Sequence, residues 1–333
     1  MEELFSAGDL EDLKRRHQVI WGQNSPMPAA EIDAAIGQAE VWITSEPRAE
    51  KALLDKAQNL KAIIEVSGAF PATIDYDACF KRGIHVLSCA PGFRRAVAEM
   101  ALGMAIAGGR GLVSEHEGFR RGSEAWLSDC VNRDFTLFGA TVGFVGFGAI
   151  ARETARLLEP FGVQALAYDP YLSDVDAVDF VSLKTLAERS RVVFVCAAPT
   201  RENQGMIGAE FMGHMQTAAL LVVISRAHLV DFAALTEAVS AGRIKTAIDV
   251  FPDEPLTQDH PLRHMEGVIL SPHRAAAVKG GRQMIGELIL ADLERIERGE
   301  APQDLGCATP EIVALVAGVS DDDAVSSLIP RTE

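Results

Sequence analysis

The feature that most constrains the fold is a glycine-rich segment, TVGFVGFGAIA, at residues 141–151. An apolar run breaks into glycines and then takes on a helical pattern, which predicts a strand, a tight turn and a helix. Gly146, Gly148 and Ala151 have the spacing of G-x-G-x-x-[G/A], in which the glycines form the turn and let the backbone approach a pyrophosphate. The helix dipole favours that negative charge. The segment therefore predicts a dinucleotide-binding α/β domain.

An acidic residue downstream strengthens this interpretation. A second apolar strand, predicted at residues 165–168, ends at Asp169, about 20 residues beyond the turn, where an acid can accept a hydrogen bond from a ribose hydroxyl. Asp169 would repel a 2′-phosphate, and neither Pro170 nor Tyr171 supplies a compensating cation, so we expect NAD rather than NADP. The predicted cofactor-binding residues in this part of the chain are Gly146, Gly148, Ala149, Ile150 and Asp169.

The length and charge of the chain limit its class. A chain of 333 residues is too long for one ordinary core and predicts two domains. The 31 basic and 47 acidic residues give a net charge of −16, which disfavours nucleic acid and anionic membranes as partners. No signal peptide opens the chain and no apolar stretch is long enough to span a membrane, so we expect a cytoplasmic protein.

The cysteines suggest a reducing environment. There are five of them, an odd number, and they are dispersed without C-x-x-C spacing. This predicts reduced, mostly buried thiols and no metal site. The five are Cys79, Cys89, Cys130, Cys196 and Cys307.

Residues 1–90 alternate between short apolar runs and amphipathic segments. The predicted helices span residues 8–16, 29–38, 48–57 and 76–82, and the predicted strands span residues 18–21, 41–44, 61–65 and 84–87. Such alternation predicts a parallel sheet covered by helices on both faces. The chain opens on a helix with no strand before it, so either a first strand is missing or the domain is shortened.

A loop at residues 67–71 follows the predicted strand 61–65, at the edge where open parallel sheets bind ligands. If the amides of Ser67, Gly68 and Ala69 are free, they could hold a substrate carboxylate, as backbone nests do. An ordinary connection between a strand and a helix is the competing interpretation.

A long helix is predicted over residues 93–108. Arg94 at its start would reach an anion bound nearby, although such arginines usually form solvated helix ends. In the polar segment that follows, we expect Trp126 to anchor a loop.

Beyond Asp169 the alternation continues, which predicts a doubly wound sheet of six or seven parallel strands with crossover helices. Its later strands are predicted at residues 179–181, 191–196, 219–224, 247–251 and 267–270.

Three charged or titratable residues follow successive strands of this sheet, namely Arg226, Glu254 and His273. The carboxyl ends of parallel strands converge on one crevice. An arginine can bind a carboxylate through two hydrogen bonds, and a histidine can transfer a proton near neutral pH when a glutamate favours its imidazolium form. Each residue alone has a more common structural explanation, but their joint placement behind a dinucleotide motif favours catalysis.

With these motifs in order, the chain resembles the D-isomer-specific 2-hydroxyacid dehydrogenases, which include phosphoglycerate dehydrogenase, D-lactate dehydrogenase and the glyoxylate/hydroxypyruvate reductases. The resemblance runs from about residue 40 to about residue 300. It rests on the segments at residues 142–151, 168–171, 225–231, 249–255 and 271–273.

The resemblance implies an architecture and a set of roles. A smaller, flavodoxin-like α/β substrate domain would comprise residues 1–92 and 274–307, and a Rossmann NAD domain residues 93–273. Residues 308–333 mix acids, serines and small apolar residues, which predicts a loosely attached tail. The family pattern implies a homodimer in which Arg226 binds the substrate carboxylate, His273 is the acid/base and Glu254 pairs with it. The further residues implied to contact the cofactor are Ala198, Ile224, Ser225, Asp249 and Ala276.

Several positions depart from the family pattern. Val223 replaces the usual asparagine before the arginine motif, Ala227 replaces the glycine after it, and Arg274 follows the histidine. Phe70 replaces a common glycine and would reshape the substrate pocket, while Arg94 or Arg274 would add charge for a second anionic group.

These observations predict an NAD-dependent oxidoreductase that interconverts a small D-2-hydroxy acid and its 2-oxo acid. An alternative from another class is an NAD-sensing dimeric interaction protein, which would resemble the C-terminal-binding corepressors. A formate-dehydrogenase-like reaction is a further alternative, but that branch would call for a neutral residue in place of Glu254.

Overall fold

The computed structural model describes residues 3–23, 27–45, 47–124, 126, 133–172, 175–176 and 178–316. The chain divides into two compact units. Unit 1 is formed by residues 1–94 and 276–333, and unit 2 by residues 95–275. Each crossing between the units falls two residues after the boundary expected from the sequence.

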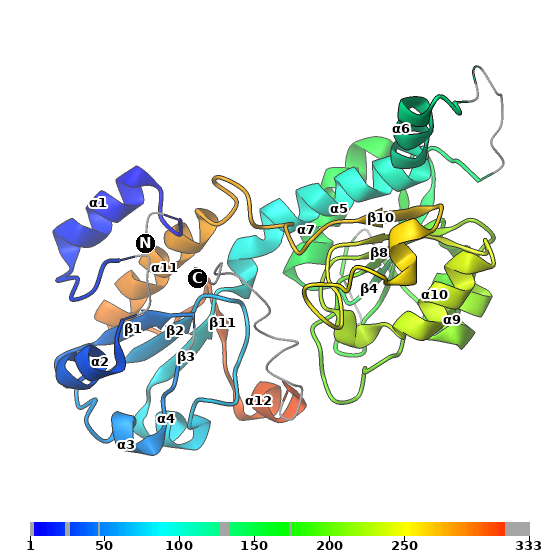
Figure 1. Cartoon of the computed structure of the whole chain (residues 1–333). Coiled ribbons are helices and arrows are strands. Elements are labelled where there is room, and N and C mark those ends of the chain that lie inside the picture. Colours follow the sequence, from blue (N-terminus) through cyan, green and yellow to red (C-terminus); the bar gives the residue numbers. More distant parts are fainter. Residues whose placement is uncertain are drawn as a thin grey trace. The chain divides into compact units, whose positions relative to one another are not determined.

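Unit 1 contains a four-stranded sheet in the order β1-β2-β3-β11 (Figure 1). Strands β1 (Val41–Thr44), β2 (Ala62–Glu65) and β3 (His85–Ser88) are parallel, as the alternation predicts. Strand β11 (Gly306–Cys307), from the far end of the chain, pairs antiparallel with β3. The sheet therefore joins the two segments of unit 1 through backbone hydrogen bonds.

The helices of unit 1 also come from both segments. Helix α11 (Met284–Glu297) contacts α1 (Ala7–Arg16), and the amide of Gly286 donates to the carbonyl of Leu4 at 2.9 Å. The core between sheet and helices is apolar, and Ile63 and Cys79 are fully buried in it. The helices are α1 (Ala7–Arg16), α2 (Ala29–Ala35), α3 (Lys51–Leu54), α4 (Tyr76–Arg82), η1 (Ala90–Phe93), α11 (Met284–Glu297) and α12 (Pro310–Val316).

Three expectations for unit 1 were wrong. Residues 18–21 form no strand, because they are exposed or half-buried and pair with no neighbouring strand. The helix expected over residues 48–57 is only the short α3. The tail is not loosely attached at its start, since Ala308 is buried and Val313 of α12 packs against the core. The expected tail beyond residue 316 lies outside the described residues.

Unit 2 contains the predicted doubly wound sheet, with seven parallel strands in the order β10-β9-β8-β7-β4-β5-β6. The order reverses beside β4, which is the topological switch point where such sheets bind ligands. The strands are β4 (Thr141–Val145), β5 (Gln164–Tyr168), β6 (Asp179–Phe180), β7 (Val192–Val195), β8 (Leu220–Val223), β9 (Lys245–Ile248) and β10 (Val268–Leu270).

The central strands of this sheet are buried on both faces. Phe144 of β4 stacks on Phe194 of β7 with ring centroids 5.3 Å apart. Continuous apolar runs such as residues 192–195 are typical of strands covered by helices on both sides. The helices of unit 2 are α5 (Arg94–Gly109, whose first residue belongs to unit 1), α6 (Leu112–Arg121), α7 (Ala149–Leu158), η2 (Glu159–Phe161), α8 (Leu183–Arg189), α9 (Ala209–His214), η3 (Ala227–Leu229), α10 (Phe232–Ser240) and η4 (Pro261–His264).

Polar caps fix where several helices begin. The side chain at the start of each of these helices accepts a hydrogen bond from an amide of the first turn, which satisfies a donor that the helix itself leaves unpaired. The capping residues are Ser6 for α1, Asp75 for α4, Ser182 for α8 and Asp231 for α10.

The remaining expectations concern Trp126, the cysteines and membrane spans. Trp126 does not anchor a loop, since it is 74% exposed and touches Phe119, which is also exposed. Four cysteines lie among the described residues and all are free, with only Cys307 partly exposed, while Cys130 lies outside them. No single helix in the described ranges has the length and apolarity to cross a membrane. Residues 90–109 and 112–121 meet that test only together, as a pair bent by 58°.

Candidate active site

The glycine turn after β4 is open where a cofactor would approach. Gly146 has φ +82°, and a Cβ there would lie 2.4 Å from the Cα of Ala197, so only glycine fits. A Cβ on Gly148 would meet nothing within 4 Å. Gly148 is also the N-cap of α7 and supplies no side-chain cap to the first turn. The turn thus leaves space and uncapped amides together, which suits a pyrophosphate.

Asp169 lies just beyond β5 and is half-buried beside this turn. One carboxylate oxygen accepts the amide of Phe147 at 2.9 Å, and the other accepts the amide of Tyr171 at 3.0 Å. The carboxylate therefore ties the glycine turn to the end of the neighbouring strand. A carboxylate oxygen can accept further hydrogen bonds, so this placement fits the predicted contact with a ribose. Together with the open turn, it makes unit 2 suited to a dinucleotide.

The sheet brings the three predicted catalytic residues to one edge. Strands β8, β9 and β10 are adjacent and parallel. Arg226 lies three residues beyond β8, Glu254 six residues beyond β9 and His273 three residues beyond β10. The carboxyl ends of these neighbouring strands therefore carry a cation, an acid and an imidazole.

The imidazole and the acid are in direct contact. Nδ1 of His273 lies 2.9 Å from Oε2 and 3.1 Å from Oε1 of Glu254. Oε1 also accepts the amide of Phe251 at 3.0 Å, which fixes the carboxylate against its own loop. The Glu254 side chain is 10% exposed and that of His273 is 24% exposed. With Nδ1 held by the carboxylate, Nε2 is the ring nitrogen placed to exchange a proton.

The backbone at His273 is held in a left-handed conformation, with φ +50°. Its amide donates to the carbonyl of Asp249 at 2.8 Å and to that of Ser271 at 3.0 Å. Such a conformation is uncommon for a residue other than glycine and persists only where the surroundings hold it. The loop after β10 is therefore built to present this one side chain.

Asp249 supplies much of that support. Its side chain is 1% exposed. Oδ1 accepts the Ser271 hydroxyl at 2.5 Å and the Arg274 amide at 2.8 Å, and Oδ2 accepts the Ala275 amide at 3.0 Å. The buried carboxylate of Asp249 thus positions the histidine loop, while its contact with the cofactor stays a prediction. This role was missed, although an acid inside the apolar strand expected at residues 247–251 is an unusual signal.

The other predicted cofactor residues differ in exposure. Ala198, after β7, is exposed, and Ala276 is half-buried in unit 1. Ile224 and Ser225, after β8, are 3% and 6% exposed, so their side chains pack into unit 2. Their contact with a cofactor stays a prediction.

Arg226 is half-buried and donates from one guanidinium nitrogen to the carbonyl of Ser225 at 2.8 Å. The two departures beside it, Val223 and Ala227, are both buried in the apolar core of unit 2. Both departures therefore lie in the core and not on the exposed surface of the site.

The loop after β2 does not have the free amides that we expected. The amide of Ser67 donates to Oε1 of Glu65 at 2.7 Å, and those of Gly68 and Ala69 donate to Oε2 at 2.8 and 2.7 Å. The premise for carboxylate binding by these residues was therefore wrong, because a carboxylate of the chain itself already holds the amides. Glu65 was missed, although an acid at the end of an apolar strand is an unusual signal.

Two further residues of unit 1 were linked to the substrate. Arg94 donates to the carbonyl of Pro91 at 3.1 Å, the contact of an ordinary helix start. Phe70 packs against the apolar core of unit 1, which gives this replacement of glycine a packing role. Binding of an anion by Arg94 stays a prediction.

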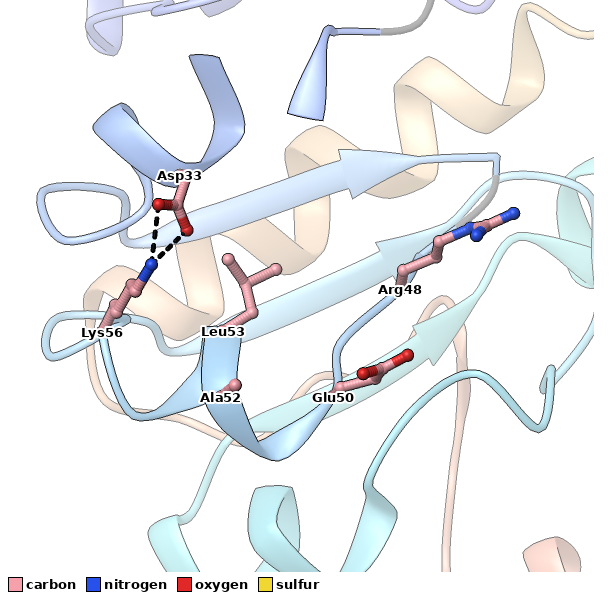
Figure 2. Close-up of a pocket in the computed structure, with 6 residues that line it drawn as sticks. All are labelled: Asp33, Arg48, Glu50, Ala52, Leu53 and Lys56. Carbon is pink, nitrogen blue, oxygen red and sulfur yellow. Dashed lines mark hydrogen bonds and ion pairs between the residues drawn. The ribbon is translucent and has the colours of Figure 1, made fainter. Parts of the chain in front are cut away.

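A surface pocket in unit 1 lies away from these residues. Asp33 and Lys56 form an ion pair of 2.5 Å across one side of it (Figure 2). Its lining contains none of the predicted site residues and consists of Asp33, Arg48, Glu50, Ala52, Leu53 and Lys56.

Comparisons with known proteins agree with a nucleotide-binding fold in unit 2. Residues 102–275 match the model of a family described as D-isomer specific 2-hydroxyacid dehydrogenase, NAD binding domain. A glyoxylate reductase from Thermofilum pendens is 35% identical over 261 residues, covering 76% of this chain and 76% of the relative. A D-3-phosphoglycerate dehydrogenase from Methanocaldococcus jannaschii is 28% identical, and the match spans 83% of this chain but 53% of that longer protein.

A solved structure extends the likeness to the fold. The crystal structure of a phosphoglycerate oxidoreductase from Rhizobium etli matches with a TM-score of 0.81 and 32% identity. The match covers 93% of this chain and 95% of that one, so the likeness extends over most of the chain.

Proposed function

The chain belongs to the D-isomer-specific 2-hydroxyacid dehydrogenase family of NAD-dependent oxidoreductases acting on CH–OH donors, and from this premise we propose that it interconverts a small D-2-hydroxy acid and its 2-oxo acid. The observation that carries the proposal is the pair of His273 and Glu254 at the same sheet edge as Arg226. The relatives compared above are oxidoreductases and do not support the interaction-protein alternative.

The residues divide the work of carbonyl reduction. Arg226 binds the substrate carboxylate through charge-assisted hydrogen bonds and so orients the carbonyl group. Nε2 of His273 donates a proton to the carbonyl oxygen while Glu254 holds Nδ1 and stabilises the charged ring. The hydride for the carbonyl carbon would come from a nicotinamide cofactor held by the glycine turn and Asp169. In the oxidative direction, Nε2 takes the hydroxyl proton back.

The open turn after β4 indicates where the cofactor would bind. The amides at the start of α7 would hold the pyrophosphate over Gly148, and Asp169 would accept a ribose hydroxyl. A 2′-phosphate would meet the Asp169 charge, so we propose a preference for NAD over NADP. The homodimer and the cytoplasmic location stay predictions from the resemblance and the sequence.

The test is NADH oxidation, in parallel with NADPH, against 2-oxo acids graded by size and charge. His273→Asn should lower kcat by about 10²- to 10⁴-fold, the usual contribution of a general acid. Asparagine tolerates the left-handed backbone, so the variant removes the ring with little change in the loop. NADH affinity, followed by fluorescence, should be nearly unchanged.

His264→Asn is the matched control, because His264 is an exposed residue of η4 in the same unit. It should turn over like the wild-type protein. Undiminished turnover in His273→Asn, or an equal loss of turnover and NADH binding, would contradict the proposed role.

A further inference from the structure

The chain between β7 and α9 runs beside the turn that follows Arg226. We call residues 196–208, which join these two elements, the β7 loop. The turn is η3, which begins directly after the arginine. The amide of Gly205 donates to the carbonyl of His228, and that of Ile207 donates to the last residue of η3, both at 2.9 Å. The later part of the β7 loop is therefore paired with η3 through the backbone.

The ring of His228 makes a second connection, to an earlier part of the same loop. Its Nε2 lies 2.8 Å from the carbonyl oxygen of Thr200. A carbonyl only accepts hydrogen bonds, so Nε2 is the ring nitrogen that carries the proton in this bond. The ring is half-buried and Thr200 is 8% exposed, so the bond is partly shielded from water. The β7 loop is thus held to η3 at two places.

Asn203 fixes the shape of the loop between these two places. Its Oδ1 accepts the amide of Thr200, and its Nδ2 donates to the carbonyl of Ala198, both at 2.8 Å. Its own amide donates to the Thr200 carbonyl at 3.3 Å. The carbonyl that accepts the His228 ring therefore belongs to a segment held by its own hydrogen bonds. Ala198, which we predict to contact the cofactor, lies in that segment.

The other end of this connection lies close to Arg226. A single residue, Ala227, separates Arg226 from His228, and it is 6% exposed. Because η3 is short and bonded to the β7 loop, a shift of the His228 ring shifts the backbone that carries Arg226. An arginine that binds a carboxylate through two hydrogen bonds needs an accurate position, and a displacement of about 1 Å can cost about 10²-fold in rate.

We propose that His228 is a positioning residue that ties the turn carrying Arg226 to the β7 loop. The arginine and a segment predicted to contact the cofactor then keep one mutual geometry. This inference rests on the proposed function, which assigns the substrate carboxylate to Arg226. Without the ring, the Thr200 carbonyl loses its partner in η3 and Arg226 is held less accurately.

The first experiment compares His228→Ala and His228→Gln in the reduction of glyoxylate at saturating NADH. Glutamine carries an N–H donor four bonds from Cα, as histidine does at Nε2, so it can restore the bond to Thr200. We expect kcat/KM to fall roughly 10- to 100-fold in His228→Ala, mainly through a higher KM, and to recover most of this loss in His228→Gln. An unchanged kcat/KM in His228→Ala, or an equal loss in both variants, would overturn the proposal.

His260→Ala is the matched control in the same unit. His260 is also half-buried, and its Nδ1 accepts the amide of Leu262 at 3.3 Å, at the start of η4. This variant loses a hydrogen bond between a histidine and the backbone but leaves the β7 loop and η3 unchanged. It should keep the kcat/KM of the wild-type protein, whatever its Tm. A loss as large as that in His228→Ala would mean that general stability explains both variants, and the positioning role would fail.

A double-mutant cycle tests whether His228 acts through Arg226. Lysine binds a carboxylate as a point charge on a flexible stem, so it depends less on an exact position than the planar guanidinium does. In an Arg226→Lys background, His228→Ala should therefore lower kcat/KM by about threefold or less. The full loss in both backgrounds would show that His228 acts by another route.

Hydrogen exchange separates this inference from the proposed function. The amides of Asn203 and Gly205 donate to Thr200 and His228, so their exchange reports how firmly the β7 loop is held. Exchange of both amides should be about five- to tenfold faster in His228→Ala, the value of one hydrogen bond, and close to wild type in His228→Gln. Unchanged exchange in His228→Ala would contradict the inference. If no protein turns over any 2-oxo acid, the proposed function fails, while exchange still decides whether the ring holds the loop.

A last measurement needs no variant. In the wild-type protein, the ¹⁵N chemical shifts of the neutral His228 ring should place its proton on Nε2, because the Thr200 carbonyl accepts it. A neutral ring with its proton on Nδ1 would rule out this bond and the role built on it.

Discussion

Two loops of this protein were expected to bind anions through backbone amides. In one loop the amides are open to a ligand, and in the other they are already bonded to a side chain. The turn after β4 places uncapped amides beside open space at Gly148. The loop after β2 places three amides on a carboxylate that the chain already carries. Backbone amides do not distinguish a ligand from a side chain. One residue at a strand end therefore decides whether such a loop is open or filled.

The largest effect should come from breaking the geometry that keeps the first loop open. In Gly146→Ala the Cβ would lie 2.4 Å from the backbone of Ala197, at φ +82°. We expect a loss of roughly 3 kcal/mol or more in the free energy of unfolding, from overpacking added to left-handed strain. Urea denaturation measures it.

Gly162→Ala separates the two causes. Gly162 has φ +61° in the same unit, and its Cβ would meet nothing within 4 Å. This variant should lose only about 1 kcal/mol, from backbone strain alone. Equal losses in the two variants would show that the contact with Ala197 is unimportant.

The next effect comes from filling the open loop, as Glu65 fills the other. Gly148→Val places a branched side chain in the space over the start of α7, at φ −81°, a conformation that valine adopts. We expect Kd for NADH to rise by roughly 10- to 100-fold, because the pyrophosphate loses amide contacts. Gly148→Ala should have a smaller effect, and an unchanged Kd in both variants would mean that the space is not the cofactor site.

The smallest effect is the pH dependence of stability that Glu65 causes in the loop after β2. Burial raises the pKa of Glu65 in the folded protein. The folded state therefore binds this proton more tightly than the unfolded state does. The resulting stabilisation is present below the unfolded pKa of about 4.3 and is lost as the pH rises through the folded pKa.

Denaturation of the wild-type protein and Glu65→Gln between pH 4 and pH 8 tests this sign. The free energy of unfolding of the wild-type protein, relative to the variant, should fall as the pH rises. A relative stability that rises with pH would mean that the amides outweigh burial, so that the carboxylate is held more strongly than we infer.

Much of the site in unit 2 could be predicted from the sequence because it depends on strand order. Alternating elements imply a parallel sheet, and a parallel sheet brings its carboxyl ends together. Arg226, Glu254 and His273 could thus be grouped although they lie far apart in the chain. The glycine turn could also be predicted, because the positive φ of Gly146 is a backbone conformation that favours glycine.

The roles of Asp249 and Glu65 could not be predicted from the sequence, because they depend on which backbone amides their side chains contact. Asp249 bonds to residues 22 to 26 positions away, and Glu65 folds back onto amides two to four positions ahead. Neither set of hydrogen bonds produces a periodic pattern in the sequence. The strand expected at residues 18–21 failed for a related reason, because apolar composition alone does not provide a neighbour to pair with.

At His273 the backbone conformation that destabilises the fold is combined with the side chain that we propose for proton transfer. Holding a histidine at φ +50° costs about 1 kcal/mol relative to a relaxed conformation, and glycine or asparagine would reduce that cost. A selection for heat resistance alone would therefore favour replacing the residue that we propose to transfer the proton.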